Sequence, residues 1–573
     1  MPKNHFKPLP EACGDLQVNC CRNPHCPSYG IVRNEGKGSQ PVLNREGQPV
    51  KYTLTGSVDE LYLCCHSCRK YSPLKSNAGI MEEYERISAY SKYKAFVSCP
   101  NLNCENHDKP LNEFSESYYK YGKTDLEKQR FQCKVCKKTF IVSNGHTKQK
   151  YSHLNRSIFV DLIGKNPFNR IIDAENISPK TLYDKISFIE KKCLAFSSHK
   201  EFTKLPTLKI DRVYLGVDQQ FFTVNWRTKT DRRNVILRGI ASCDTKTGYC
   251  FAFNLNYDSC FQQYGVEQKA AECNDCSLPP SYRKFARIWL MDDYNKLTDG
   301  EIKRSKIIVD DSSQKEGDLS VYTRPPSNGV QIHSVYTMFG HFLLLSNLLK
   351  NVEKIRFALD CDAGMKTACL SIFKDRVLDR TCDIFEVHSK HNFTIDTIFK
   401  MRIENKKLIE DTILQYGLNN EHQAMQVLLG QKLEKIYNNK EIRFDKRWIE
   451  FPFIHNGELV KRIRHATDFH EYDFHHLVNL YLKTSLHTTN SLFQLARRLI
   501  VLLERPLKTS TIDSMWYIYS AYNPVVVQQL LNIFRTYYNY CRKSKKTKQT
   551  PAMRLGLAKG VVDPADILYF GYY

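Results

Sequence analysis

The sequence predicts a multidomain α/β protein in which two small cysteine-rich units and a helical segment precede a mixed β-sheet. Three observations support this fold class. Two cysteine quartets fall within the first 136 residues, a helix-start signature follows at 176–179, and apolar strand-like segments begin at Val213. With 573 residues, of which 42% are hydrophobic, the chain is long enough for roughly three to five folded units.

The composition is strongly basic, with 84 Lys and Arg against 61 Asp and Glu and a net charge of +23. Such a balance favours a polyanionic partner, although charge alone does not separate nucleic acid from an anionic membrane. No apolar run approaches the roughly 20 residues that span a bilayer, and the N-terminus lacks the apolar core of a signal peptide. We therefore expect a soluble, intracellular protein whose 21 cysteines are reduced and, where paired, bind metal.

Two zinc ribbons are predicted, over residues 1–80 and 93–148. In each, a Cys-x₄-Cys pair is followed by a Cys-x₂-Cys knuckle, and two such pairs complete a structural Zn²⁺ site. The predicted ligands are Cys21, Cys26, Cys65 and Cys68 in the first ribbon and Cys99, Cys104, Cys133 and Cys136 in the second. Cys20 and Cys64 adjoin ligands, so the first set could shift by one residue. A third pair, Cys273 and Cys276, is either a metal site or a loop. The ligands do not indicate whether a ribbon contacts DNA or protein.

A helix-turn-helix is predicted over residues 150–200, with short helices at Ser157–Ile163 and Phe168–Glu175. Ser178 is the expected N-cap and Pro179 the first residue of the third helix, which continues through Lys180–Phe196. The helical spacing of its apolar residues predicts which side chains are buried and which are exposed at its start. The buried face comprises Leu182, Ile186, Ile189 and Cys193, and the expected DNA contacts at the start are Lys180, Thr181, Tyr183 and Lys185. The alternative is an ordinary three-helix linker.

The catalytic domain is predicted over residues 208–510, with an insertion at about 395–485 and a helical C-terminal tail at 511–573. The expected elements are strands at Val213–Asp218, Val235–Cys243, Tyr249–Asn256, Ile355–Asp362 and Cys382–Val387, and helices at His333–Leu349 and Met365–Leu378. This order, three strands and then two helix–strand units, is that of an RNase H-like mixed sheet. Carboxylates end its first and fourth strands.

Those carboxylates predict a site for Mg²⁺ or Mn²⁺. Attack on a phosphodiester requires an activated nucleophile and a stabilised leaving oxygen, and two ions held by carboxylates about 4 Å apart provide both. Asp218 is the first candidate ligand. Asp360 and Asp362 would share a face of a regular strand, and either could be the second. An isolated Asp at a strand end is more often a solvated turn residue, but the ordered set favours function.

The chain resembles bacterial insertion-sequence transposases of the DDE superfamily. The resemblance rests on the stretch 359–365 (LDCDAGM), on 487–490 (HTTN), on Arg497 and Arg498, on 503–506 (LERP), and on the tail segments 523–524, 533–539 and 550–558. It implies cleavage at element ends and joining to target DNA, with double-stranded DNA as partner and multimers as the active form. It also implies a location in the bacterial cytoplasm, with the nucleoid.

The same resemblance implies a catalytic Glu on a helix after the fifth strand. Glu504 is the only acidic residue of the predicted helix Ser491–Glu504 and is the choice, with Arg497 and Arg498 as DNA contacts. The alternative is a structural ion pair between Glu504 and one of these arginines. The insertion carries expected helices at Ile403–Tyr416 and His422–Tyr437. Its histidine-rich segment is interpreted as surface or DNA-facing, and its members are His465, His470, His475 and His476.

Three functions compete. The first is an active transposase. The second is a zinc-dependent DNA-binding regulator that derives from a transposase and lacks catalysis, and the third is an RNase H-like nuclease without joining activity. The joint presence of Asp218, Asp360, Asp362 and Glu504 favours an enzyme.

Overall fold

The chain forms two compact units in a computed structural model. Unit 1 comprises residues 1–87 and 209–494, and unit 2 comprises residues 88–208 and 495–573. The structure describes the whole chain except residues 1–7, 35–39, 58–59, 94–95, 126, 143–148, 225–233, 299–323, 391–392, 440–445, 455–457, 459, 506, 509–514, 518 and 572–573. Each unit is thus built from segments distant in sequence, and the predicted domains do not follow one another as separate units.

A seven-stranded mixed sheet is the centre of unit 1, in the order β14-β15-β13-β12-β7-β8-β9. Within this sheet, β8 pairs antiparallel with both β7 and β9. Strand β12 runs parallel to β7, and β13 runs parallel to β12. The five strands expected from the sequence therefore occur in the spatial order 3-2-1-4-5. Their bounds are β7 Arg212–Val224, β8 Val235–Asp244, β9 Cys250–Leu255, β12 Lys354–Asp360 and β13 Cys382–Lys390.

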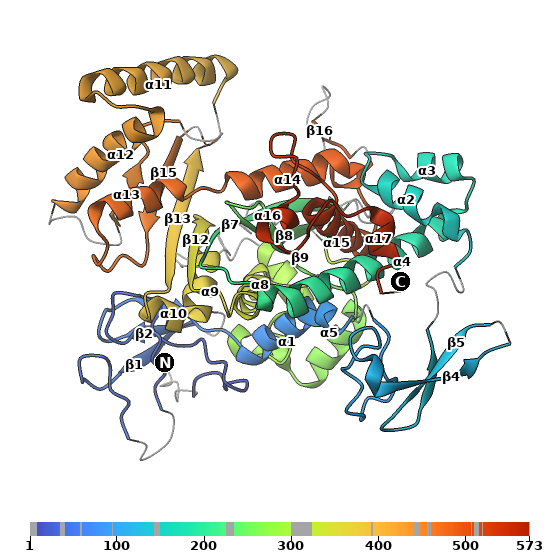
Figure 1. Ribbon diagram of the computed structural model, residues 1–573. Helices are drawn as coiled ribbons and strands as arrows, with labels where there is room; N and C mark the ends of the chain where they lie inside the picture. The colour runs from blue at the N-terminus through green and yellow to red at the C-terminus, as the bar shows by residue number, and fades with distance from the viewer. Residues whose placement is uncertain are drawn as a thin grey trace. The chain divides into compact units, whose positions relative to one another are not determined.

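Helices cover both faces of this sheet (Figure 1). On one face lie α8 (Ser334–Leu348) and α9 (Ala363–Ile372), followed by the short α10 (Lys374–Leu378). On the other lie α13 (Phe474–Lys483) and α14 (His487–Leu499). Because nearly every residue of α8 is buried, this helix has no polar face, as expected for a helix between a sheet and a second layer.

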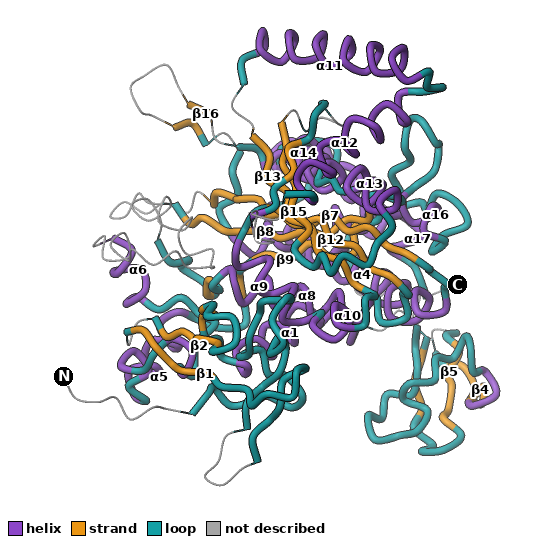
Figure 2. Tube along the Cα trace, turned by 90° about the vertical axis from the view of Figure 1, so that its left-hand side faces the viewer, coloured by secondary structure: helices purple, strands orange, loops and turns teal. Residues whose placement is uncertain are grey.

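The predicted insertion is part of the sheet rather than an appendage. Its strands β14 (Ile449–Glu450) and β15 (Val460–His465) extend the sheet beyond β13, to which β15 pairs antiparallel. Helices α11 (Ile395–Tyr416) and α12 (Glu421–Tyr437) precede them, and α11 lies at the outer edge of the unit (Figure 2). Leu429 and Leu433 of α12 pack with α13 and Phe385 in one hydrophobic core.

The first cysteine quartet lies beside a three-stranded sheet, β1 (Tyr52–Gly56), β2 (Leu61–Cys65) and β3 (Tyr71–Pro73), and is followed by α1 (Asn77–Ser88). We call the quartet and these strands the first ribbon. It packs on the helical layer of unit 1. The Tyr29 hydroxyl donates to the Leu370 carbonyl of α9 at 2.7 Å, and the Arg22 guanidinium lies 6.0 Å from the Phe339 ring of α8.

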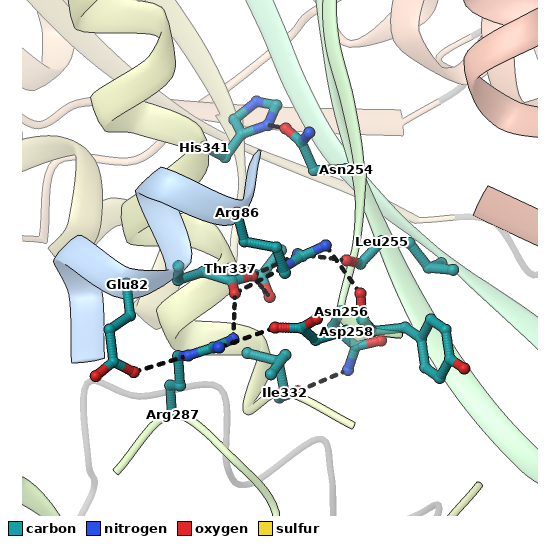
Figure 3. Close-up of polar contacts among 12 residues, drawn as sticks. Glu82, Arg86, Asn254, Leu255, Asn256, Asp258, Arg287, Ile332, Thr337 and His341 are labelled. Carbon is teal, nitrogen blue, oxygen red and sulfur yellow. Dashed lines mark hydrogen bonds and ion pairs between the residues drawn. The ribbon is translucent and has the colours of Figure 1, made fainter. Parts of the chain in front are cut away.

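A buried polar network fixes α1 to the same layer (Figure 3). The Glu83 side chain is fully buried and accepts from Arg86, from Arg287 at 3.1 Å and from Thr337 of α8 at 2.9 Å. Arg287 also pairs with Asp258 at 2.8 Å. Two carboxylates thus balance two guanidinium groups, which is what makes burial of these charges tolerable. The smaller elements of this region are β10 Tyr257–Asp258, α5 Gln263–Glu272, α6 Met291–Thr298 and β11 Val330–Gln331.

Unit 2 contains the second cysteine quartet with β4 (Tyr118–Lys123), β5 (Gln129–Cys133) and β6 (Thr139–Ile141), together called the second ribbon. The predicted trio of helices follows at α2 Asn155–Leu162, α3 Phe168–Glu175 and α4 Pro179–Ser198. The remaining elements are β16 Leu507–Lys508, β17 Met515–Trp516, α15 Pro524–Tyr540, α16 Pro551–Leu555 and α17 Pro564–Leu568.

The C-terminal helices belong to the same compact unit as α2, α3 and α4 and do not form an independent tail. Arg535 of α15 pairs at 2.8 Å with Glu201, just after α4, and the Tyr90 hydroxyl donates to the same buried carboxylate. The Phe196 ring of α4 meets the Tyr540 ring edge-on at a centroid distance of 4.8 Å. Among the described residues, no helix combines the length and hydrophobicity that crossing a bilayer requires.

Candidate functional sites

Asp218 and Asp360 lie side by side on neighbouring parallel strands. Val217 of β7 pairs with Leu359 of β12, and the next residue along each strand is the aspartate. Because paired residues of parallel strands point to the same face, both carboxylates leave one face of the sheet at adjacent positions. Both are half-buried, and the Gln219 backbone N–H donates to Asp218 Oδ1 at 2.6 Å. The arrangement offers hard oxygen ligands of the kind that Mg²⁺ and Mn²⁺ prefer.

Asp362 has a different position from the one expected. The predicted strand through Ile355–Asp362 ends at Asp360, so the two aspartates do not share a strand face. Asp362 is the N-cap of α9, and its Oδ1 accepts from the backbone N–H of Gly364 at 2.9 Å and of Met365 at 3.2 Å. An N-cap carboxylate satisfies backbone donors that the first helical turn leaves unpaired. This geometry favours Asp360 as the second candidate ligand.

The turn between α13 and α14 lies over the same strand as Asp218. Gly216 is two residues before Asp218 and faces the same side, where a Cβ would lie 3.1 Å from the Ser485 carbonyl oxygen. The Thr489 hydroxyl donates to the Gly216 carbonyl at 2.7 Å. Glycine at this position therefore permits close approach of the helix start.

The same turn is held by a buried ion pair that the sequence does not reveal. Glu458 pairs with Lys461 at 2.7 Å and accepts from the Ser485 hydroxyl and from the Leu486 backbone N–H. Lys461 also donates to the Thr484 carbonyl at 3.0 Å. Glu458 is therefore a positioning residue beside the candidate site. The only signal for it is the Glu-x-x-Lys spacing, which many exposed segments share.

The helix predicted to carry Glu504 is shorter than expected. Helix α14 ends at Leu499, and after a 3-10 turn at Val501–Leu503 the Glu504 backbone is extended. The helical placement of Glu504 is therefore wrong. Glu504 belongs to unit 2 and pairs there with Lys165 at 3.3 Å, not with Arg497 or Arg498. Its catalytic role stays a prediction.

The two predicted arginines differ in their surroundings. Arg498 is exposed, whereas burial lowers the pKa of Arg497 to about 10. Among the residues that the structure describes, no partner accepts a hydrogen bond from the buried Nη1 of Arg497. Arg497 thus retains donor capacity for an anion, and Arg498 is accessible to one.

Each cysteine quartet forms a group that could hold a zinc ion. In both, the four Sγ atoms lie within 4.8 Å of one another. In the first quartet, Sγ–Sγ distances are 3.6 Å for Cys21–Cys68 and 3.7 Å for Cys26–Cys65. In the second they are 3.3 Å for Cys99–Cys136 and 3.7 Å for Cys104–Cys133. A tetrahedral Zn²⁺ with Zn–S bonds of about 2.3 Å separates its thiolates by about 3.8 Å, whereas a disulfide is about 2.05 Å long. The donor set and spacing therefore fit zinc.

The ligand assignments match the prediction residue for residue. Cys20 does not join the first quartet and donates instead to the Val18 carbonyl. Hydrogen bonds from the Cys21 and Cys26 thiols lower the pKa of Cys68 to about 6, whereas the pKa values of the two donors are raised. Within the described chain, Cys273 and Cys276 form no group of three or more ligands.

A tyrosine that the sequence reasoning missed supports each quartet. The Tyr52 hydroxyl accepts from the backbone N–H of Cys21 at 3.1 Å, and the Tyr118 hydroxyl accepts from that of Cys99 at 3.2 Å. Each tyrosine pairs across the sheet with the first cysteine of its knuckle. The available signal is Tyr-x₃-Gly before each knuckle, at 52–56 and 118–122.

The three helices predicted for the helix-turn-helix segment are present, and one of the predicted contact residues is buried. Ser178 caps α4 by accepting from Thr181 N–H, with Pro179 in the first turn. Lys180 and Tyr183 are exposed and Thr181 is half-buried, so all three can meet a partner. Lys185 cannot, because its ammonium is buried and donates to the Lys150 carbonyl at 2.5 Å and to Asn155 Oδ1 at 2.6 Å. The helical period turns this residue toward the core.

The histidine-rich segment is only partly at the surface. His465 is buried on β15, pairs with Asp383 at 3.3 Å and stacks on the Phe385 ring at 4.2 Å, so its interpretation as surface or DNA-facing is wrong. Alternation along the strand explains this, because Ile463 and His465 share the inward face. His470 and His475 are exposed and His476 is half-buried.

No protein-family model matches the chain, and no curated protein sequence is significantly similar to it.

Proposed function

We propose that this chain is a DNA transposase of the DDE type, which cleaves and joins DNA strands with Mg²⁺ or Mn²⁺ as cofactor. The observation that carries the proposal is the pair Asp218 and Asp360, adjacent on one face of parallel strands. Their sheet has the spatial order 3-2-1-4-5, and along the chain its first three strands precede two helix–strand units, the sequence order predicted for an RNase H-like domain. The two candidate zinc centres, the capped helix α4 and the net charge of +23 support binding to double-stranded DNA.

Each residue has a defined part in this proposal. Asp218 and Asp360 would hold the divalent ion, which when bound activates the attacking hydroxyl and neutralises charge on the leaving oxygen. Asp362 fixes the start of α9 directly after the strand that carries Asp360. Glu458 and Lys461 fix the turn that lies over Gly216. Lys180, Thr181 and Tyr183 would contact DNA from the start of α4, with zinc maintaining each ribbon.

Two observations favour the second candidate, a DNA-binding regulator without catalysis. Among the described residues, the two cysteine quartets are the only groups in which three or more potential metal ligands lie together. Glu504, the predicted third carboxylate, has Lys165 as an ion-pair partner. A regulator needs neither a third carboxylate nor a divalent ion.

The deciding experiment incubates the purified full chain with Mg²⁺, labelled DNA from the flanks of its own gene and a supercoiled target plasmid. The transposase proposal expects nicks at discrete flank positions and joined products, both abolished in Asp218→Ala. Cleavage without joining would identify a nuclease instead. Specific binding without Mg²⁺-dependent cleavage would identify the regulator and overturn the proposal.

A further inference from the structure

The second ribbon carries a surface that the proposed catalysis does not use. Tyr119 and Tyr121 alternate along β4 and therefore share a face, and their side chains are 51% and 49% exposed. Tyrosine is enriched at interfaces because its ring is apolar and its hydroxyl is polar. We call the surface the aromatic–basic face, and it consists of Tyr119, Tyr121, Arg130, Lys134 and Lys137.

Cations lie over both rings. Lys134 Nζ is 4.7 Å and Lys137 Nζ 5.9 Å from the Tyr119 ring centroid, and the Arg130 guanidinium carbon is 5.5 Å from that of Tyr121. A cation over a ring is attracted by the negative face of the π system, which limits the positions of an otherwise flexible side chain. Three cations are thus oriented along one side of a short hairpin.

The hairpin around this face has a net positive charge. Residues 118–141 contain seven basic side chains and two acidic ones, Asp125 and Glu127, which gives a net charge of +5. Lys120 and Lys123 of β4 add to this charge, and both are exposed. An anionic surface with regularly spaced charges is the complement of this arrangement, and the DNA backbone is one.

The first ribbon provides an internal reference, because the two hairpins align through their pairing. Tyr52 pairs with Cys65 as Tyr118 pairs with Cys133. On this alignment the aromatic–basic face corresponds, in the first ribbon, to four residues of smaller size or lower charge, Thr53, Thr55, Tyr62 and His66, and to Arg69, which keeps the positive charge of Lys137. Residues 52–73 contain two basic and two acidic side chains, a net charge of zero. The zinc scaffold therefore does not require the aromatic–basic face.

We infer that the aromatic–basic face of the second ribbon binds the phosphate backbone of double-stranded DNA without reading its sequence. The inference rests on the proposed function in that DNA is the polyanion that the chain binds. Arg130, Lys134 and Lys137 contact phosphates, and Tyr119 and Tyr121 hold these cations in place. The second ribbon thus adds affinity, and base selection is left to helix α4.

The test measures DNA affinity of the full-length protein by fluorescence anisotropy between about 50 and 200 mM salt. Lys134→Gln with Lys137→Gln removes two phosphate contacts. The slope of log K against log salt should then become shallower by about 1.8, and affinity at physiological salt should fall by about 30-fold, equally on specific and unrelated DNA. The double variant Tyr119→Thr with Tyr121→Thr introduces the threonines found at the aligned positions of the first ribbon. It should weaken DNA binding by about 5-fold.

Arg69→Gln is the matched control, since Arg69 follows its knuckle as Lys137 does, with φ of 57° against 58°. It should leave the slope unchanged, and every variant should retain two zinc ions per chain. An unchanged slope in the Lys134 and Lys137 double variant overturns the inference, while Mg²⁺-dependent cleavage in that variant keeps the proposed function. If the double variant shows the expected slope change but the wild-type protein does not cleave DNA, only the proposed function is overturned. Absence of DNA binding overturns both.

Discussion

The two ribbons have the same metal-binding plan and different surroundings. In each, four cysteines converge and a tyrosine hydroxyl accepts from the first ligand's N–H. In the first ribbon, however, Tyr62 and Leu63 of β2 are buried, and Tyr29 and Arg22 contact helices of unit 1. The second has a small core of its own, formed by its ligands and by residues such as Tyr118 and Phe140. A metal site therefore fixes the local fold, and the side chains around it decide whether the ribbon supports a sheet or meets a partner.

Removal of the metal should have the largest effect and should separate the two ribbons. A structural zinc site contributes on the order of 10 kcal/mol to folding, as much as the stability of a whole domain. Cys65→Ser with Cys68→Ser should therefore raise amide hydrogen exchange in β12, because the first ribbon packs on α8 and α9. Cys133→Ser with Cys136→Ser should leave exchange in β12 unchanged. Hydrogen exchange is followed by mass spectrometry. Equal exchange in β12 in the two variants would contradict the claim that only the first ribbon supports the sheet.

The buried network behind the first ribbon should give the next largest effect. Glu83→Ala leaves Arg86 and Arg287 with less compensation in a dry site and should lower the free energy of unfolding by about 3 kcal/mol. The adjacent Glu82 also pairs with Arg287, at 3.0 Å, but is 49% exposed. Glu82→Ala should cost less than about 1 kcal/mol. Urea unfolding measures both, and a similar loss in the two variants would show that α1 is not anchored by burial.

The tyrosine hydroxyls should give the smallest effect, and the same one in both ribbons. Tyr52→Phe and Tyr118→Phe each leave a cysteine N–H without its acceptor, at a cost of about 1 to 2 kcal/mol. Zinc release to a chromogenic chelator should accelerate by a similar factor in each variant. Acceleration in one ribbon only would mean that the shared hydrogen bond does not support both metal sites.

Local signals predicted much of this structure. The cysteine spacing identified both quartets, and Ser178 with Pro179 identified the start of α4. Apolar segments located the five strands whose order is 3-2-1-4-5. These features depend on neighbours within a few residues, where propensity and spacing are informative.

What the sequence did not predict depends on contacts between distant segments. Strand β15 joins β13 across about seventy residues, and this pairing buries His465. The helical period turns Lys185 toward the core, but the two acceptors of its ammonium, Lys150 and Asn155, lie 35 and 30 residues earlier in the chain. The roles of Asp360 and Asp362 separate because β12 ends at Asp360, two residues before the N-cap of α9. Spacing alone does not identify the distant partners on which these outcomes depend.

The central claim, that the adjacent aspartates form a catalytic site, is tested most directly by a pair of neighbouring variants. Nicking of supercoiled plasmid by the full chain with Mg²⁺ is compared for Asp360→Asn and Asp362→Asn. Asparagine caps a helix as well as aspartate does, so Asp362→Asn should keep activity within about fivefold of the wild type. Asp360→Asn should lose about 10³-fold, since it removes a ligand of the ion that stabilises the transition state. Full activity in Asp360→Asn would contradict the account.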